Sequence, residues 1–311
     1  MSTLTFIDNV KISLQYMLPK TMLSRLTGKL ASMPLGIVTT NIIKWFINRY
    51  QVNMQEALHE EADAYATFND FFTRPLKPHV RPIDTDPNIL CHPVDGKVSQ
   101  LGEIKQGRIF QAKGHHFELQ TLVGGQATDA KPFQNGVFAN IYLAPKDYHR
   151  IHMPIDGTLT KMIFVPGELF SVNPLTAANV PNLFARNERV VAFFETAIGP
   201  MAMVLVGATI VASIETVWAG TVAPQEQQVA HWHYQSQANT PITLKKGEEM
   251  GRFKLGSTVI LLFGANAIDN FADGLQANTD TIMGTPMAQI QKHTSVNFQN
   301  STTTRQPEAA L

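Results

Sequence analysis

The sequence predicts an α+β fold, with a helical N-terminal region followed by a mainly antiparallel β core. Helical periodicity is confined to about the first 50 residues, whereas short alternating apolar runs separated by turn residues recur from about residue 85. Apolar residues make up 44% of the 311 residues and charged residues 16%, a composition that supports a sizeable core. We expect a helical, membrane-associating region at 1–75, a β-rich domain at 76–290 and a disordered polar tail at 291–311.

The N-terminal region contains two stretches with helical patterns. In "LPKTMLSRLTGKLASMP", Pro19 suits a helix start and Pro34 a helix end. The apolar positions of this stretch fall on one stripe, at Met22, Leu26, Leu30 and Met33. The second stretch, "LGIVTTNIIKWFINRY", places two aromatic residues between Lys44 and Arg49.

Charge is distributed unevenly along the chain, although the formal net charge is zero. Residues 1–50 contain six basic residues and one acidic residue, which are Lys11, Lys20, Arg25, Lys29, Lys44, Arg49 and Asp8. A basic amphipathic helix with an aromatic residue is suited to a membrane interface, but a helix pair packed on its own domain explains the same pattern. Zero net charge gives no argument for nucleic acid as a partner. We expect neither a secretory signal nor a helix that crosses a bilayer.

The β core is expected from a series of short strands. They occur in "DGKVSQLGEI", "GRIFQAKG", "GVFANIYLAP", "DGTLTKMIFV", "RVVAFFETAIGPMAMVLVGATIVASIE" and "GSTVILLFG". Two of these runs open on Asp-Gly, a strong turn dipeptide, and several are rich in β-branched and aromatic residues. In the last run, Gly256 and Ser257 precede the apolar strand 258–263. This pair packs poorly in a strand, so it is either a turn or bulge at the strand entry or a site of chemistry.

One interpretation of the ten histidines is a metal site. His231 and His233 would point to the same side of a strand, and with His92 and Asp95 they could form a hydrolytic zinc site. On its own this His-x-His spacing is weak evidence, and we expect no metal. The single Cys91 excludes an internal disulfide and is interpreted as a small buried residue rather than a nucleophile.

A second interpretation is a serine nucleophile. A serine hydroxyl needs a base within hydrogen-bond reach, and a carboxylate usually orients that base. Ser257, His152 and Asp95 could form such a triad. However, Ser257 does not lie in the Gly-x-Ser-x-Gly turn of ordinary hydrolases, so the residues alone leave the question open.

Several motifs together resemble the bacterial phosphatidylserine decarboxylases. "KLGST" at 254–258 resembles the Leu-Gly-Ser-Thr motif of that family, and "FNDFFTRPLKPHVRPID" at 68–84 resembles its Phe-Phe-x-Arg segment. "PVDGKVSQLG" resembles its Asp-Gly segment, "YLAPKDYHRIHMPIDG" its histidine-rich segment, and "VPGELFSVNP" at 165–174 the loop that follows. The resemblance covers about residues 50–265 in the expected order. Val94, where alanine is commoner, is a small departure, as is the long polar tail.

The resemblance implies a proenzyme that cuts itself between Gly256 and Ser257. Ser257 would attack the Gly256 carbonyl, with His152 as general base and Asp95 orienting the imidazole. β-Elimination and loss of ammonia would then leave a pyruvoyl group on residue 257. The products would be a β chain of residues 1–256 and an α chain of residues 257–311, held as a heterodimer that could itself dimerise.

The resemblance also implies the reaction and its location. The pyruvoyl group would form a Schiff base with the amine of phosphatidylserine and accept the electrons released as carbon dioxide leaves, giving phosphatidylethanolamine. His149 is a candidate proton donor, and Phe170, Ser171 and Asn173 are candidate headgroup-binding residues, although a purely structural role for each is equally compatible. A lipid substrate favours membrane contact through residues 1–50, with an anionic surface as partner on the cytoplasmic side of the cell membrane.

Three other functions are weighed against this one. A zinc peptidase would bind metal and be sensitive to chelators. A peripheral lipid-binding protein without turnover would stay a single chain. A pyruvoyl decarboxylase for a soluble amino acid would not need the N-terminal helices. None of the three explains the Gly-Ser pair, the histidine segment and the Asp-Gly segment in this order.

Overall fold

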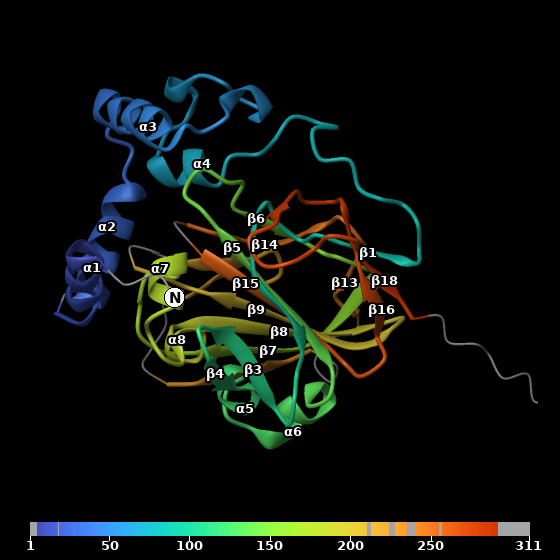
Figure 1. The fold of residues 1–311 in the computed structure, drawn as a ribbon. Coiled ribbons are helices and arrows are strands. Elements are labelled where there is room, and N and C mark those ends of the chain that lie inside the picture. Colours follow the sequence, from blue (N-terminus) through green and yellow to red (C-terminus); the bar gives the residue numbers. More distant parts are fainter. Residues whose placement is uncertain are drawn as a thin grey trace, which may run out of the picture.

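The structure is a computed structural model that describes residues 5–17, 19–209, 213–223, 228–234, 240–254 and 257–291. The long helices at the N-terminal end of the chain lie on one side of a β core, which confirms the predicted α+β class (Figure 1). The predicted disordered tail lies outside the described residues except for residue 291. The domain boundaries proposed from the sequence stay predictions.

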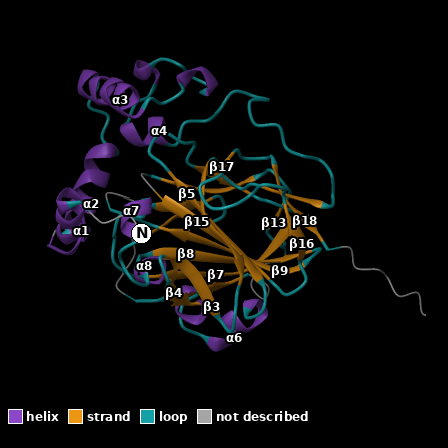
Figure 2. Ribbon diagram, in the orientation of Figure 1, coloured by secondary structure: helices purple, strands orange, loops and turns teal. Residues whose placement is uncertain are grey.

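The N-terminal region contains three long helices where the sequence patterns predict two (Figure 2). They are α1 (Phe6–Met17), α2 (Lys20–Ala31) and α3 (Ile37–Tyr50). The additional helix, α1, has no buried residue. Helix α3 turns large apolar side chains inward, where Ile43 and Phe46 pack with Phe71 and Phe72.

Helix α4 (Phe68–Phe72) connects these helices to the β core. It starts at a capping box, in which Thr67 accepts from the backbone N–H of Asp70 and the Asp70 side chain accepts from the backbone N–H of Thr67. After α4 the chain runs as an extended segment over the core until the first strand, as the teal loop in Figure 1 shows. This segment contains "TRPLKPHVRPID".

A large antiparallel sheet forms the centre of the molecule. In the described residues its strand order is β12-β7-β8-β9-β15-β5-β2-β17, with β13 also paired to β7. The bounds are β2 (Gly96–Glu103), β5 (Val137–Leu143), β7 (Gly157–Val165), β8 (Arg189–Thr196), β9 (Gly199–Val206), β12 (Ala230–His233), β13 (Thr243–Leu244), β15 (Ser257–Phe263) and β17 (Asp280–Thr281).

Smaller sheets and short helices cover the large sheet. One small sheet has the order β11-β10-β14-β6, another β1-β18-β16, and β3 pairs with β4. The strands are β1 (Ile89–Cys91), β3 (Arg108–Ala112), β4 (His115–Glu118), β6 (Arg150–His152), β10 (Ile214–Thr216), β11 (Gly220–Ala223), β14 (Glu249–Phe253), β16 (Ile268–Phe271) and β18 (Pro286–Ile290). The short helices are α5 (Leu119–Leu122), α6 (Ala127–Ala130), α7 (Pro174–Ala177) and α8 (Leu183–Arg186), with 3₁₀ turns at Met54–Glu56, Ala62–Ala64 and Lys131–Phe133.

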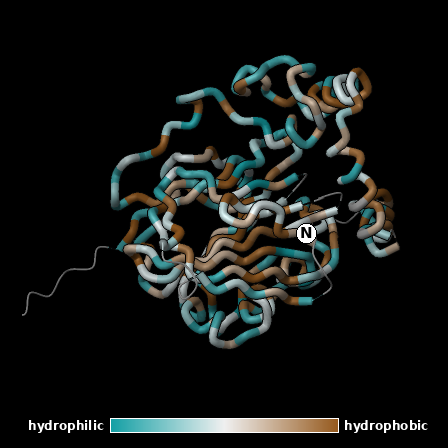
Figure 3. Tube along the Cα trace, turned by 180° about the vertical axis from the view of Figure 1, so that it is seen from behind, coloured by the Kyte–Doolittle hydropathy of each residue, from teal (hydrophilic) through white to brown (hydrophobic). Residues whose placement is uncertain are grey.

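Strand β15 is buried on both faces, which explains its continuous apolar sequence. Val259 and Leu261 face a core shared with Met250 of the β14 sheet. Ile260 faces the opposite core, which the short helices cover. The brown central strands in Figure 3 show the same apolar concentration. Because β15 lies between β5 and β9, its first residue is held by the rigid centre of the fold.

Candidate active site

Ser257 is the first residue of β15 and lies opposite Leu143 of β5. Its side chain is completely buried, and its Oγ has no hydrogen-bond partner among the residues that the structure describes. A buried polar group without a partner costs about 1–3 kcal/mol, so an unpaired hydroxyl here is a feature to be explained. Gly256, the other residue of the predicted cleavage bond, lies outside the described residues.

His152 ends β6 and has both ring nitrogens engaged. Its Nδ1 lies 2.8 Å from the carbonyl oxygen of Gly247, and its Nε2 lies 3.0 Å from the Tyr148 hydroxyl. Because a carbonyl can only accept, Nδ1 carries the proton and Nε2 accepts from Tyr148. Burial lowers the pKa of His152, which keeps the ring neutral and Nε2 basic at neutral pH.

Asp95 is buried and bound by Arg81. The Nε of Arg81 donates to both carboxylate oxygens of Asp95 at 2.9 and 3.0 Å, and its Nη2 donates to Oδ2 at 2.6 Å. The backbone N–H of Met283 adds a bond of 2.8 Å, while Arg81 also binds Glu56 at 2.7 Å. In the described part of the chain, Asp95 is therefore bonded to Arg81 and not to His152.

The fold nevertheless brings the three predicted residues toward one region. The backbone N–H of His152 donates to the carbonyl of Pro93, two residues before Asp95. The backbone N–H of Phe253, four residues before Ser257, donates to the carbonyl of His149 in the histidine segment. Thus β6 lies beside the Asp-Gly segment, and β14 runs past the histidine segment before the chain reaches Ser257. A catalytic role for the three residues stays a prediction.

His149 is fully buried and stacked on Phe72, with ring centroids 4.0 Å apart. Its Nε2 lies 3.1 Å from the Ala144 carbonyl oxygen and must donate to it, whereas Nδ1 has no partner among the described residues. Burial lowers the pKa of His149 to about 3. The predicted role of His149 as proton donor stays a prediction.

The three predicted headgroup residues make structural contacts. Phe170 is buried under Lys20 of α2, whose Nζ lies 3.5 Å from the ring centroid. The backbone N–H of Ser171 donates to the side chain of Gln15 at 3.0 Å, and Asn173 caps α7. These contacts attach α1 and α2 to the loop at 165–174. Substrate binding by the three residues stays a prediction.

Sequence reasoning did not identify Arg81, Tyr148 and Gly247 as site residues, although they hold Asp95 and His152. Arg81 and Tyr148 lie inside motifs that were recognised as segments, "FNDFFTRPLKPHVRPID" and "YLAPKDYHRIHMPIDG". No spacing rule links either to its partner, because both contacts depend on the fold. Gly247 contributes only its carbonyl group, which leaves no signal in the sequence.

The proposed zinc residues are dispersed. His231 and His233 lie on the exposed side of β12, whereas His92 is buried. Within the described ranges, no group of three or more His, Cys, Asp or Glu side chains is arranged to hold a metal ion. Cys91 is buried, and burial raises the pKa of its thiol, which is consistent with a structural residue.

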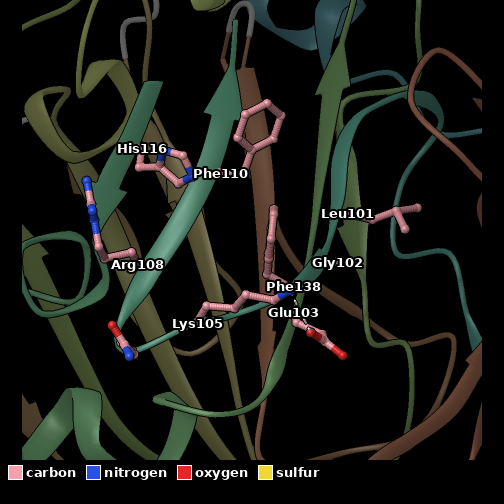
Figure 4. A pocket seen from close by; sticks show the side chains of 9 residues that line it. Leu101, Gly102, Glu103, Lys105, Arg108, Phe110, His116 and Phe138 are labelled. Carbon is pink, nitrogen blue, oxygen red and sulfur yellow. Dashed lines mark ion pairs between the residues drawn. The ribbon is translucent and has the colours of Figure 1, made fainter. Parts of the chain in front are cut away.

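Two pockets differ in their relation to the predicted site residues. An open groove of about 590 Å³ lies between β2 and the β3–β4 hairpin, where His116 lies beside Phe110 and Lys105 and Arg108 also line the groove (Figure 4). None of the predicted site residues lines it. A smaller pocket of about 220 Å³ includes both Asp95 and Tyr148 and therefore adjoins the candidate site.

Comparison with known proteins places the chain in one family. The sequence profile described as phosphatidylserine decarboxylase matches residues 68–289, and a second profile, described as PSD, matches residues 10–51. The phosphatidylserine decarboxylase proenzyme of Shewanella sp. strain ANA-3 is 65% identical over 291 residues, covering 93% of this chain and 100% of the relative. That of Shewanella baltica strain OS155 is 66% identical over 285 residues, covering 91% and 98%. The family predicted from the motifs is confirmed, and the chain belongs to the phosphatidylserine decarboxylase family.

Proposed function

We propose that the chain is a phosphatidylserine decarboxylase made as a proenzyme, which converts phosphatidylserine to phosphatidylethanolamine and carbon dioxide. Family membership over most of the chain supports the activity, and the similar Shewanella proteins are named as proenzymes. The observation that carries the proposal is Ser257, a buried hydroxyl with no partner in the described part of the chain, at the start of a central strand and directly after a glycine.

Self-cleavage begins at Ser257. Its Oγ attacks the carbonyl carbon of Gly256, the Gly256–Ser257 C–N bond breaks, and the freed amine stays on residue 257 as the ester forms. Loss of the Cα proton of residue 257 then expels the Gly256 carboxylate. The resulting enamine takes up water and releases ammonia, which leaves a pyruvoyl group. Glycine suits the scissile position because no side chain obstructs attack on its carbonyl group.

His152 is the base that we assign to the first step. The Gly247 carbonyl fixes the tautomer with a basic Nε2, and burial keeps the ring unprotonated at neutral pH. The Tyr148 hydroxyl donates a hydrogen bond of 3.0 Å to Nε2. To act as base, Nε2 must therefore release Tyr148 and accept a hydrogen bond from the Ser257 hydroxyl. A positioned general base typically accelerates a reaction by a factor of about 10²–10⁴. Asp95 lies nearby and favours the charged imidazole through its negative charge.

The position of residue 257 fits a pyruvoyl group. Its side chain is fully buried, and its strand is paired with β5 and β9, so a group formed there would be held rigidly and away from water. When formed, the pyruvoyl carbonyl supplies the electron sink for decarboxylation. The same pairing keeps the α chain, residues 257–311, associated with the β chain after cleavage. Dimerisation of this heterodimer is a further prediction.

Membrane contact is proposed through α1, α2 and α3. Large apolar side chains are exposed along all three helices, at Phe6, Ile7, Val10, Leu14, Met17, Met22, Leu26, Leu30, Ile37, Val38, Ile42 and Trp45. Lys11, Lys29 and Lys44 add positive charge, whereas Lys20 is buried in an ion pair with Glu168. None of the described helices is long and apolar enough to cross a membrane. We therefore propose a peripheral protein on the cytoplasmic side of the cell membrane.

The activity is tested by carbon dioxide release from phosphatidylserine in detergent micelles. We compare the wild type with Ser257→Ala and with Thr258→Val, which removes a second buried hydroxyl from the same strand that has no partner among the described residues. Release that is lost only in Ser257→Ala supports the proposal. Release that persists in Ser257→Ala, or that is absent from the folded wild type, contradicts it.

A further inference from the structure

Arg74 is a buried cation that the reaction described above does not use. Only 3% of the residue is exposed. Its Nη2 donates to the carbonyl oxygens of Lys146 and Asp147 at 3.0 and 3.4 Å, but its Nε and Nη1 have no partner among the described residues. Arginine stays charged even where burial lowers its pKa, as it does here. A buried guanidinium with unpaired N–H groups indicates a place for an anion.

Arg74 lines the 220 Å³ pocket that also includes Asp95 and Tyr148. The second arginine of this pocket, Arg81, is neutralised by Asp95 and Glu56. Lys146 is exposed at the rim, and its Nζ is in no ion pair among the described residues. Arg74 and Lys146 are therefore the cations available to a ligand. The volume is enough for a small oxyanion.

We propose that Arg74, with Lys146, binds the phosphodiester of the phospholipid substrate, an inference that rests on the proposed function. The substrate has two anionic groups, a carboxylate and a phosphodiester. The carboxylate loses its charge as carbon dioxide leaves, so a cation on it would stabilise the ground state more than the transition state. The phosphodiester keeps its charge throughout, and binding it by a cation does not oppose the reaction.

The surroundings of the pocket match the order of groups in a phospholipid. An apolar groove of about 380 Å³ on α2 and α3 is lined by Leu30, Trp45 and Tyr50. The next residue, Gln51, already lines the polar pocket. Tyr148, which also lines the polar pocket, contacts His152. The apolar groove adjoins the cationic pocket, and the cationic pocket adjoins the reactive residues. In a phospholipid substrate, the acyl chains, the phosphodiester and the serine follow one another in the same order. A free inorganic phosphate would not need the apolar part.

The test measures kcat and KM for short-chain, monomeric phosphatidylserine after self-cleavage is complete. Arg74→Gln and Lys146→Gln are compared with Lys77→Gln, which removes an exposed lysine paired with Glu60. We expect KM to rise about ten- to hundred-fold in Arg74→Gln, with less effect in Lys146→Gln and none in the control, while kcat changes little. Arg74→Lys should recover part of the loss. Inhibition by glycerophosphoethanolamine should weaken by the same factor as KM.

Three results would overturn the assignment. One is an unchanged KM in both Arg74→Gln and Lys146→Gln. A second is a fall in self-cleavage or kcat in Arg74→Gln with KM unchanged in Lys146→Gln, which indicates that Arg74 only positions the loop at residues 146 and 147. The third is inhibition by inorganic phosphate as strong as that by glycerophosphoethanolamine. A wild type that releases no carbon dioxide would instead contradict the proposed function itself.

Discussion

Arg81 binds Asp95 through three hydrogen bonds of 2.6, 2.9 and 3.0 Å and reaches Glu56 with the same guanidinium. Asp95 therefore has a cationic partner of its own, and the Gly247 carbonyl fixes the tautomer of His152. In this arrangement burial lowers the pKa of His152 and the negative charge of Asp95 acts to raise it, while the described residues show no hydrogen bond between the two side chains. Arg81 is a positioning residue for Asp95, and it joins the segment after α4 to the candidate site.

Removing Arg81 should destabilise the protein. In Arg81→Met the carboxylates of Asp95 and Glu56 lose their shared cation, and breaking a buried pair costs about 3 kcal/mol or more. The free energy of unfolding from urea titration measures the loss. Lys77→Met is the matched control, because its ion pair with Glu60 is exposed and should contribute less than about 1 kcal/mol. Equal losses in both variants would contradict this role of Arg81.

Acid should destabilise the fold through its buried histidines. Burial lowers the pKa of His92 to about 4, whereas a histidine in the unfolded chain titrates near pH 6.5. Between these values the unfolded state binds more protons, so stability falls as the pH falls through this window. Across this window, His92 lowers the free energy of unfolding by about 3 kcal/mol.

The dependence of unfolding free energy on pH between 4 and 7 checks this. His92→Gln should show a shallower slope than the wild type, whereas the exposed His233→Gln should keep the wild-type slope. A His92 variant with an unchanged slope would show that this group does not stay neutral in the folded state.

The rate of self-cleavage should rise with pH. A general base works only when it is unprotonated, and burial lowers the pKa of His152, so the rate should reach its plateau by neutral pH. Tyr148→Phe removes the hydroxyl that binds Nε2 of the neutral ring, which raises the pKa of His152 and moves the midpoint to higher pH. Processing of newly translated chains between pH 5 and 8 measures both effects, with the exposed Tyr16→Phe as control. A rate that falls with rising pH would argue against His152 as base.

Membrane binding should depend on the exposed apolar face of the helices. Leu26→Asp places a charge on α2, and loss of one leucine from the membrane contact weakens binding about ten-fold or more. Flotation with vesicles containing phosphatidylserine measures it. Val217→Asp is the control, because Val217 is 50% exposed in the β region and Leu26 54% exposed. Equal binding by both variants and the wild type would rule out this face as the contact surface.

The strands of the core and the candidate Ser257 were predictable because their signals are local. Continuous apolar runs and Asp-Gly turns predict strands such as β15, and the family motifs place Ser257 at its start. Helix α1 was missed although Thr5 and Asp8 form a capping box at its start, in which each side chain accepts a hydrogen bond from the backbone N–H of the other residue. Its apolar side chains are exposed in the structure, so no core pattern marks it.

The arrangement around the predicted triad could not be read from the sequence. Arg81 and Asp95 are separated by 14 residues, and Gly247 lies 95 residues from His152. Such contacts follow from how β6, β14 and the extended segment pack, which no local pattern encodes. The same holds for the packing of the Phe170 ring beneath Lys20 of α2, two residues that lie far apart in the sequence.

Intact mass spectrometry of the purified protein beside Ser257→Ala tests the central claim most directly. The account predicts two wild-type chains split after Gly256, with the smaller chain lighter than its sequence by one molecule of ammonia, and a single intact chain for the variant. A folded wild type that remains one intact chain after long incubation would contradict self-cleavage, and with it the pyruvoyl group on which the proposed decarboxylation depends.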